Sequence, residues 1–337
     1  MIMAEFSRLD QVLYVNLEPM FYPGKHILVA GGAGSGKTST LLLMAKLFYD
    51  NNETIVWRDD SSLEFLSLAD EVPLKIFIPR NCRLNYTHPN VEFFEYDPKN
   101  IFGIFNNFDQ KKINAILFDL FCFDIGKFIR FWKDFFYALY KWKRTKMGTA
   151  VAFFTDELND LAAGARRGYI PKQLNLASNI FFSLKKFRKE KIRLVASTHG
   201  FNDLHKPVRD SFNFYIIRKM RREAVPDRFV NYTHLIEKLD VKEGIVVDET
   251  GAFNRMEFPL YVKPKNVSVT FEGDIEELET RETQREMGMA VKYRERLAIS
   301  GKALLDHGVV KSYDELAQLW NVSTGEAWKI VRGRTGT

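Results

Sequence analysis

Short apolar runs alternate with helical patterns along residues 1–262. The runs cover residues 27–30, 54–57, 74–78, 91–94, 150–155 and 192–197. Each ends in polar or turn-forming residues, and bounded runs of this kind predict strands buried in a sheet. Strands that alternate with helices form βαβ units and a mainly parallel sheet. We therefore expect an α/β fold for this part of the chain.

The helical pattern is clearest over Gln173–Lys191, where apolar residues repeat on one face. Residues 115–119 are ambiguous, because this apolar run ends in Asp119, as a metal-binding strand would. Helical periodicity continues from there to Trp132, so we expect a buried helix. Residues 80–107 are rich in Asn, Pro and aromatic side chains. We interpret them as a loop-like insertion that contains the strand at 91–94.

The composition changes after a hairpin at 241–257. We expect a core domain over 1–262, a linker over 263–280 and a helical domain over 281–337, which begins with a long helix at 281–297. Two capping boxes, Ser312–Glu315 and Ser323–Glu326, predict short helices that are joined by a tight turn. The second helix is basic, so the pair resembles a helix-turn-helix that contacts DNA. A helical tail that docks onto a protein is the alternative.

Composition and charge narrow the class of protein. The chain has 337 residues, of which 46% are hydrophobic and 27% charged, which suits a globular protein with a sizeable core. Its net charge of +6 permits an anionic partner. Two cysteines, Cys82 and Cys122, are too few for a disulfide framework or a zinc site. We find neither a secretory signal nor a membrane span in the sequence, and expect a cytoplasmic protein with reduced thiols.

The sequence GGAGSGKT, Gly31–Thr38, directly follows the first apolar run and opens a helix. Glycines let backbone N–H groups turn toward a polyphosphate, and the positive end of the helix favours anions. Lys37 is expected to reach the β- and γ-phosphates, and the Thr38 hydroxyl to bind Mg²⁺. The alternative is a glycine-rich turn with an incidental lysine. The nucleotide-binding residues that we expect are Gly31, Gly32, Ala33, Gly34, Ser35, Gly36, Lys37, Thr38 and Ser39.

A pair of acidic residues is the expected partner of this loop. The run 150–155 ends in Asp156-Glu157. We expect Asp156 to hold Mg²⁺ together with Thr38, and Glu157 to accept a proton from the attacking water. A pair of surface acids is the alternative. The neighbouring run ends in Thr198-His199, where a polar tip can contact the γ-phosphate and report its loss, unless these residues only cap the strand.

These motifs resemble the FtsK/HerA superfamily of DNA-pumping ATPases. The similarity lies in the Asp-Glu-Leu-Asn-Asp-Leu box at 156–161, the helix end and strand at 184–198, and the segment 206–216. The resemblance implies a RecA-like P-loop NTPase core that uses ATP and Mg²⁺ and forms a ring, expected to be a hexamer, around double-stranded DNA. It also implies that Arg188 is a finger for a neighbour's γ-phosphate. His199 departs from the family, which has glutamine there.

The charge distribution also indicates a nucleic-acid partner. Between Leu184 and Glu223 the sequence has twelve basic residues against four acidic ones. Phosphate contacts from such a zone would be salt-sensitive and independent of sequence. An ordinary solvated surface is the alternative reading. The basic residues are Lys185, Lys186, Arg188, Lys189, Lys191, Arg193, Lys206, Arg209, Arg218, Lys219, Arg221 and Arg222.

The leading hypothesis is an ATP-driven double-stranded DNA translocase. The resemblance is strongest to viral genome-packaging ATPases, with zonula occludens toxin-like proteins as more distant relatives. It implies capsid or portal-vertex proteins as partners, and a place in the host cytoplasm or with the virion. The alternative is an AAA+-type initiator or regulatory ATPase that binds DNA through the C-terminal helix-turn-helix. The long spacing between Lys37 and Asp156 weakens this alternative, and too little chain follows the ATPase for a terminase nuclease domain.

Overall fold

The computed structural model describes residues 18–80, 82–122, 124–146, 148–164, 171–264, 267–270, 305–306, 310–320 and 324–332. The helix expected at 281–297 lies outside these residues. The chain divides into two compact units, Met1–Gly273 and Asp274–Thr337, which are described separately.

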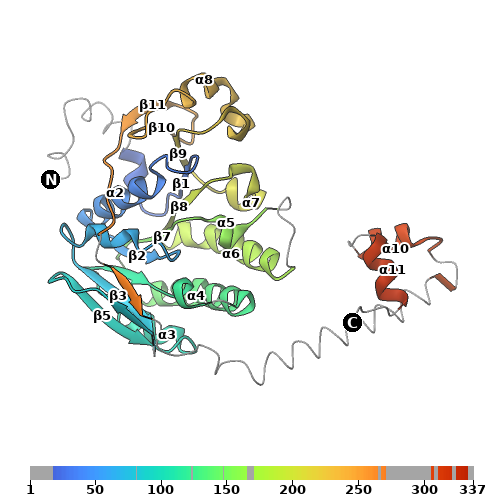
Figure 1. Cartoon of the computed structure of the whole chain (residues 1–337), viewed down its shortest axis with the longest axis horizontal. Helices are drawn as coiled ribbons and strands as arrows, with labels where there is room; N and C mark the ends of the chain where they lie inside the picture. Colours follow the sequence, from blue (N-terminus) through green and yellow to red (C-terminus); the bar gives the residue numbers. More distant parts are fainter. Residues whose placement is uncertain are drawn as a thin grey trace. The chain divides into compact units, whose positions relative to one another are not determined.

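The first unit is built on one large sheet (Figure 1). In the described residues it has ten strands in the order β11-β10-β9-β1-β8-β7-β2-β6-β3-β5. All neighbours from β9 to β5 are parallel, and β10 and β11 add an antiparallel hairpin at one edge. The strands are β1 (Ile27–Ala30), β2 (Thr54–Arg58), β3 (Leu74–Pro79), β5 (Val91–Tyr96), β6 (Ile113–Ile116), β7 (Val151–Thr155), β8 (Ile192–Thr198), β9 (Phe214–Arg218), β10 (Glu243–Val247) and β11 (Phe253–Glu257). The predicted mainly parallel sheet is confirmed.

Helices cover both faces of this sheet. Side chains of a buried strand alternate between the two sides, so each strand packs against helices on both faces. Phe153 packs on Phe136 of α4, whereas the next residue, Phe154, packs near Phe48 of α2. Both faces are therefore hydrophobic, which explains the continuous apolar runs in the sequence. The α-helices of this unit are α2 (Lys37–Asp50), α3 (Ile101–Asn106), α4 (Ile125–Thr145), α5 (Asn159–Ala162), α6 (Pro171–Lys189), α7 (Lys206–Arg209) and α8 (Thr233–Ile236).

The helix expected over 115–132 is wrong at its beginning. Residues Ile113–Ile116 form strand β6, fully buried between β2 and β3, and Asp119 starts a 3₁₀ turn. The helix begins only at Ile125, where the Asp124 carboxylate accepts a hydrogen bond from Lys127 N at 2.6 Å. A short apolar run without alternation fits a buried strand or a buried helix equally well, so periodicity could not separate them.

The stretch 80–107 is more ordered than a loop-like insertion. Its expected strand is present as β5, which forms the edge of the large sheet beside β3. Helix α3 follows, and its Ile104 and Phe105 are buried in the main core. A further strand, β4 (Arg83–Asn85), pairs with β12 (Ser268–Thr270) in a two-stranded antiparallel sheet.

The second unit contains the two helices that the capping boxes predict, α10 (Tyr313–Trp320) and α11 (Thr324–Arg332). Ser312 Oγ accepts a hydrogen bond from Glu315 N at 3.2 Å, which caps α10. Thr324 Oγ1 donates to Asp314 at 2.5 Å and ties the two helices together. Leu316 and Ala327 are buried in this unit. No helix in the described parts of the chain is both long and apolar enough to cross a membrane.

His26, just before β1, joins three elements of the core. Its side chain is 2% exposed; Nδ1 accepts a hydrogen bond from Leu194 N at 2.9 Å, and Nε2 lies 3.2 Å from Leu184 O. Both bonds form together only in the neutral ring, with the proton on Nε2. Burial, aided by the positive charges of Arg193 and Arg188, lowers the pKa of His26 to about 4.

We therefore expect the free energy of unfolding to fall as the pH drops from about 6.5 to about 4. The unfolded chain binds a proton at His26 in this range and the folded chain does not, which costs up to about 3 kcal/mol. His26→Gln should be less stable at neutral pH but should lose this pH dependence, as measured by urea unfolding at several pH values. The control is His234→Gln on the exposed surface of α8. If His26→Gln keeps the full wild-type slope, His26 is not the group responsible.

Candidate nucleotide-binding and catalytic site

The glycine-rich loop lies at the carboxyl end of β1 and leads into α2. Gly34 and Gly36 have φ angles of 68° and 83°, in the left-handed region that glycine adopts without strain. Gly31 N and Gly32 N donate to the carbonyls of Thr198 and Lys219, at 3.2 and 2.9 Å. These two amides tie the loop to its neighbouring strands, so we expect the anion-binding amides in the later part of the loop.

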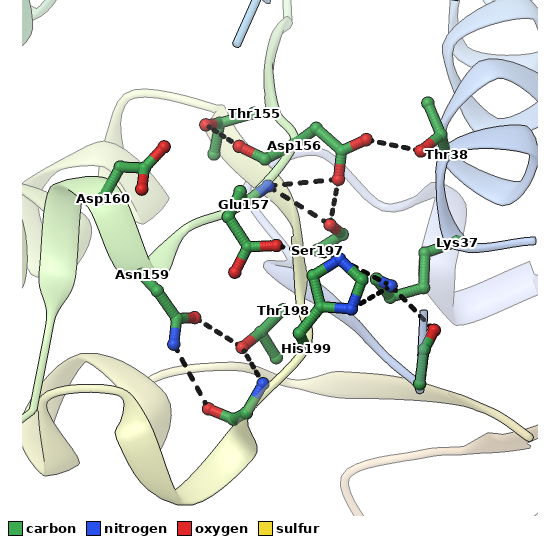
Figure 2. A network of polar contacts seen from close by, with 12 residues as sticks. Lys37, Thr38, Thr155, Asp156, Glu157, Asn159, Asp160, Ser197, Thr198 and His199 are labelled. Atoms are coloured by element: carbon green, nitrogen blue, oxygen red, sulfur yellow. Dashed lines mark hydrogen bonds and ion pairs between the residues drawn. The ribbon is translucent and has the colours of Figure 1, made fainter. Parts of the chain in front are cut away.

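The Lys37 side chain points across the loop toward the adjacent strand (Figure 2). Its Nζ donates to Gly32 O at 3.0 Å and lies 2.9 Å from His199 Nδ1. Lys37 is 5% exposed, and burial lowers its pKa from the ordinary lysine value. The ammonium group is thus held at the mouth of the loop, where it can meet a phosphate.

Thr38 and Asp156 meet as the sequence motifs predict. Thr38 Oγ1 donates to Asp156 Oδ2 at 2.5 Å, and Ser197 Oγ donates to the other carboxylate oxygen, Oδ1 (Figure 2). A hydroxyl and a carboxylate oxygen side by side are the hard ligands that Mg²⁺ prefers, and the two side chains come from the start of α2 and from the turn after β7. The donor set therefore fits a magnesium ion held by Thr38 and Asp156.

Glu157 is held in an unusual backbone conformation beside Asp156. Its φ is 47°, and its N–H donates to Asp156 Oδ1 at 3.0 Å. Its Oε2 lies 3.2 Å from His199 Nε2. Burial, together with the negative charges of Asp160 and Asp156, raises the pKa of Glu157 to about 7. A carboxylate with this affinity for protons is suited to act as a general base near neutral pH.

At the carboxyl end of β8, Thr198 and His199 have different roles. Thr198 is fully buried, and its hydroxyl donates to Asn159 Oδ1 at 2.5 Å and accepts from Gly200 N at 3.2 Å. It fixes the turn, as a strand-end cap does. The His199 ring instead lies between Lys37 and Glu157 (Figure 2). His199 is therefore the member of the pair in a position to contact a phosphate.

Within one chain, Arg188 lies away from the other predicted site residues. It lies in the last turn of α6, before β8 begins, whereas the loop and Glu157 follow the carboxyl ends of their strands. There it lines a groove of about 490 Å³ together with Lys185 and Asp210. A role at a nucleotide would require that this end of α6 meets another subunit.

Sequence reasoning missed Arg58, which lies beneath the acidic motif. Its guanidinium is fully buried and donates to Thr155 Oγ1 at 2.9 Å and to Asp156 O at 3.1 Å. Its Nη2 contacts Asp119 at 2.5 Å and Asp160 at 3.1 Å. Arg58 therefore fixes the turn that carries Asp156. The signal in the sequence was Asp119, which pairs with this arginine.

Only some of the basic residues between 184 and 223 lie on the surface. Arg193 and Arg218 are fully buried, so neither can contact DNA. Arg193 pairs with Glu53 at 2.7 Å and stacks over Phe48. The basic residues that remain exposed are Lys185, Lys186, Arg188, Lys189, Lys191, Lys206, Lys219, Arg221 and Arg222.

Comparison with known proteins supports the fold through structure alone. No protein-family model matches the sequence, and no curated protein matches it. The bacterial conjugative coupling protein TrwBΔN70 is similar in structure, with a TM-score of 0.50, 10% identity, and coverage of 76% of this chain and 89% of that chain. The core has a RecA-like P-loop ATPase fold. The predicted fold class is thereby confirmed.

Two further solved structures are similar over much of their length. VirB4 of Thermoanaerobacter pseudethanolicus has a TM-score of 0.49 and 10% identity, with coverage of 71% of this chain and 90% of that chain. The genome-packaging NTPase B204 of Sulfolobus turreted icosahedral virus 2, in complex with AMPPCP, has a TM-score of 0.47 and 11% identity. The match covers 70% of this chain and 98% of B204. At these identities the likeness concerns the fold.

The Arg58 contacts predict unequal roles for its two acidic partners. The Asp119 side chain is 8% exposed, so Asp119→Asn should leave the buried Arg58 charge with only the exposed Asp160 as a partner and lower the free energy of unfolding by about 3 kcal/mol. Asp160→Asn is the matched control, because the Asp160 side chain is 47% exposed and solvent can replace it. We expect it to cost less than about 1 kcal/mol. Urea unfolding measures both, and equal losses would contradict the prediction.

Proposed function

We propose that this protein is an ATP-driven translocase of double-stranded DNA. The observation that carries the proposal is one constellation: Lys37, the Thr38–Asp156 pair, Glu157 and His199 meet at the carboxyl ends of three adjacent strands. Each contributes a group that phosphoryl transfer to water needs, namely a cation, a metal site, a base and a polar contact for the phosphate.

Each of these residues has its own role in the hydrolysis of ATP. Lys37 binds the β- and γ-phosphates and offsets charge that develops between them. Thr38 and Asp156 would hold Mg²⁺, which would supply further positive charge to the phosphate oxygens. Glu157 orients a water molecule and takes its proton while the water oxygen bonds to the γ-phosphorus. The bond to the ADP oxygen then breaks, and the products are ADP and inorganic phosphate.

The DNA partner is supported by the exposed basic residues on and after α6 and by the motif resemblance to the FtsK/HerA superfamily. Contacts of lysine and arginine with phosphates hold DNA without reading its sequence, as a translocase requires. We infer a ring, in the form of a hexamer, that packages a viral genome with capsid or portal-vertex proteins in the host cytoplasm. The C-terminal helices serve in this proposal as a second DNA contact or as a docking module.

ATPase activity measured with and without long linear duplex DNA tests the proposal. We expect duplex DNA to raise kcat by about tenfold or more, and ATP to drive displacement of a triplex-forming strand along the duplex. The stimulation should weaken steeply with salt. Tight binding to one DNA sequence with negligible turnover would favour the initiator or regulatory ATPase instead.

Glu157→Gln separates hydrolysis from binding in the same assay. It removes the proton acceptor and keeps the size of the side chain, so kcat should fall by about 100-fold or more. The affinity for MgATP should stay within about threefold of the wild type. Hydrolysis that survives this change would show that another group takes the proton.

Arg188 is proposed to act on the nucleotide of a neighbouring subunit. Mixing Arg188→Ala with wild-type protein should then lower ATPase activity more steeply than in proportion to the variant fraction, because one variant subunit disables its neighbour's site. Asn175→Ala, at an exposed position on the same helix, is the control and should leave the activity unchanged. Activities that simply add in the mixtures would reject a role between subunits.

A further inference from the structure

Arg218 lies beneath the glycine-rich loop. It is the last residue of β9, which runs parallel to β1 with Ile217 opposite Ala30, so Arg218 is level with the start of the loop. Its side chain passes under the loop. A Cβ atom at Gly31 would lie 2.7 Å from Arg218 Cβ, and one at Gly36 would lie 2.6 Å from Arg218 Nη2. The loop therefore rests directly on the guanidinium.

The guanidinium fixes the direction of one peptide group. Arg218 Nε donates to Ser35 O at 3.0 Å, and Nη2 donates to Val241 O. In a trans peptide the carbonyl and the following N–H point in opposite directions, and the described residues contain no cis peptide. Because Ser35 O points down to Arg218, the N–H of Gly36 points away from it, to the opposite side of the loop.

Within the described residues, the charge of Arg218 has no carboxylate partner. The side chain is fully buried, and within the described residues Nη1 has no hydrogen-bond partner and no ion pair of Arg218 is found. The ring of Phe258 lies 4.6 Å from its guanidinium carbon. Burial lowers the pKa of Arg218 to about 10, so the group is still charged at neutral pH.

A buried, unpaired charge is costly unless an opposite charge approaches it. Arg218 is also among the charges that lower the pKa of Lys37, so two cations of this loop repel each other. Ser35 Oγ is also buried without a hydrogen-bond partner in the described residues. Two cations and an unsatisfied hydroxyl around one loop are the environment that a polyphosphate would complete.

We propose that Arg218 is a positioning residue of the nucleotide site. It holds the Ser35 carbonyl so that the Gly36 amide faces the phosphates, and the bound polyphosphate neutralises its charge. This inference rests on the proposed nucleotide-binding function. It removes Arg218 from the DNA-contacting residues that the sequence pattern indicated, and assigns it to binding of the triphosphate chain.

Calorimetry on the full chain tests the inference by measuring the binding of inorganic tripolyphosphate, pyrophosphate and MgATP. Arg218→Met removes both charge and hydrogen bonds and should weaken tripolyphosphate binding by about tenfold or more. Arg218→Lys keeps the charge and should stay within about threefold of the wild type, with Arg218→Gln between the two. The loss should be larger for tripolyphosphate than for pyrophosphate, because the attraction grows with ligand charge.

Lys242→Met is the matched control, since it removes a positive charge from an exposed residue next to Val241. It should bind both phosphates like the wild type. Circular dichroism and thermal unfolding without ligand check that each variant is folded. If Arg218→Met does not fold, a Lys variant that binds no better than the Gln variant overturns the inference. A folded Arg218→Met with wild-type affinity for tripolyphosphate also overturns it. Wild-type protein that binds neither ATP nor tripolyphosphate rejects the proposed function itself.

Discussion

The hydrogen bond between Thr38 and Asp156 is the contact on which the site depends. It joins the first turn of α2 to the turn after β7, two residues separated by 118 positions in the sequence, at a distance of 2.5 Å. The sheet makes it possible, because β8 lies between β1 and β7 and all three strands are parallel. Their carboxyl ends then open at the same edge. This strand order also brings Lys37, Glu157 and His199 together. Lys37 comes after the loop that follows β1, Glu157 comes just after β7, and His199 comes just after β8.

Two buried arginines support this edge from inside the protein, and a third lies at the opposite ends of the strands. Arg58 holds the turn of Asp156 and Arg218 lies beneath the glycine-rich loop, whereas Arg193 ties the start of β8 to Glu53. Burying a guanidinium is expensive, and Arg58 and Arg193 each have a carboxylate partner that offsets the cost. Arg218 has its contacts to backbone carbonyls and to the ring of Phe258. The difference singles out Arg218 as the arginine whose charge a ligand would complete.

The strained backbone at Glu157 fits the same picture. A non-glycine residue with positive φ costs free energy and persists only where the surroundings enforce it. Here the Glu157 amide is held by Asp156 Oδ1 and lies 3.3 Å from Ser197 Oγ, so the turn directs the carboxylate toward His199. Asp160, four residues after Asp156, adds the negative charge that helps to raise the pKa of Glu157. Local geometry and electrostatics thus act together on one carboxylate.

The sequence by itself determined most strands of the large sheet, the glycine-rich loop and the position of the Asp156-Glu157 motif. These signals are local: continuous apolar runs, glycines before a helix, and acids at a strand end. Sequence pattern failed at Ile113–Ile116, because a short buried strand and a buried helix have the same apolar composition. It also missed α3 in the stretch interpreted as an insertion, where short elements lack enough repeats to show a period.

Only the tertiary structure decided what the polar residues contact. Arg193 and Arg218 belong to a basic run in the sequence, yet both are buried, because other segments pack over their side chains: Phe48 of α2 over Arg193, and the glycine-rich loop and Phe258 over Arg218. Asp119 was read as a helix residue, or as a possible metal ligand, and is the partner of Arg58. The strand end Thr198-His199 offered two polar residues, and the turn after β8 buries Thr198 and directs His199 to Lys37. Long-range packing sets these contacts, and no local pattern of residues encodes it.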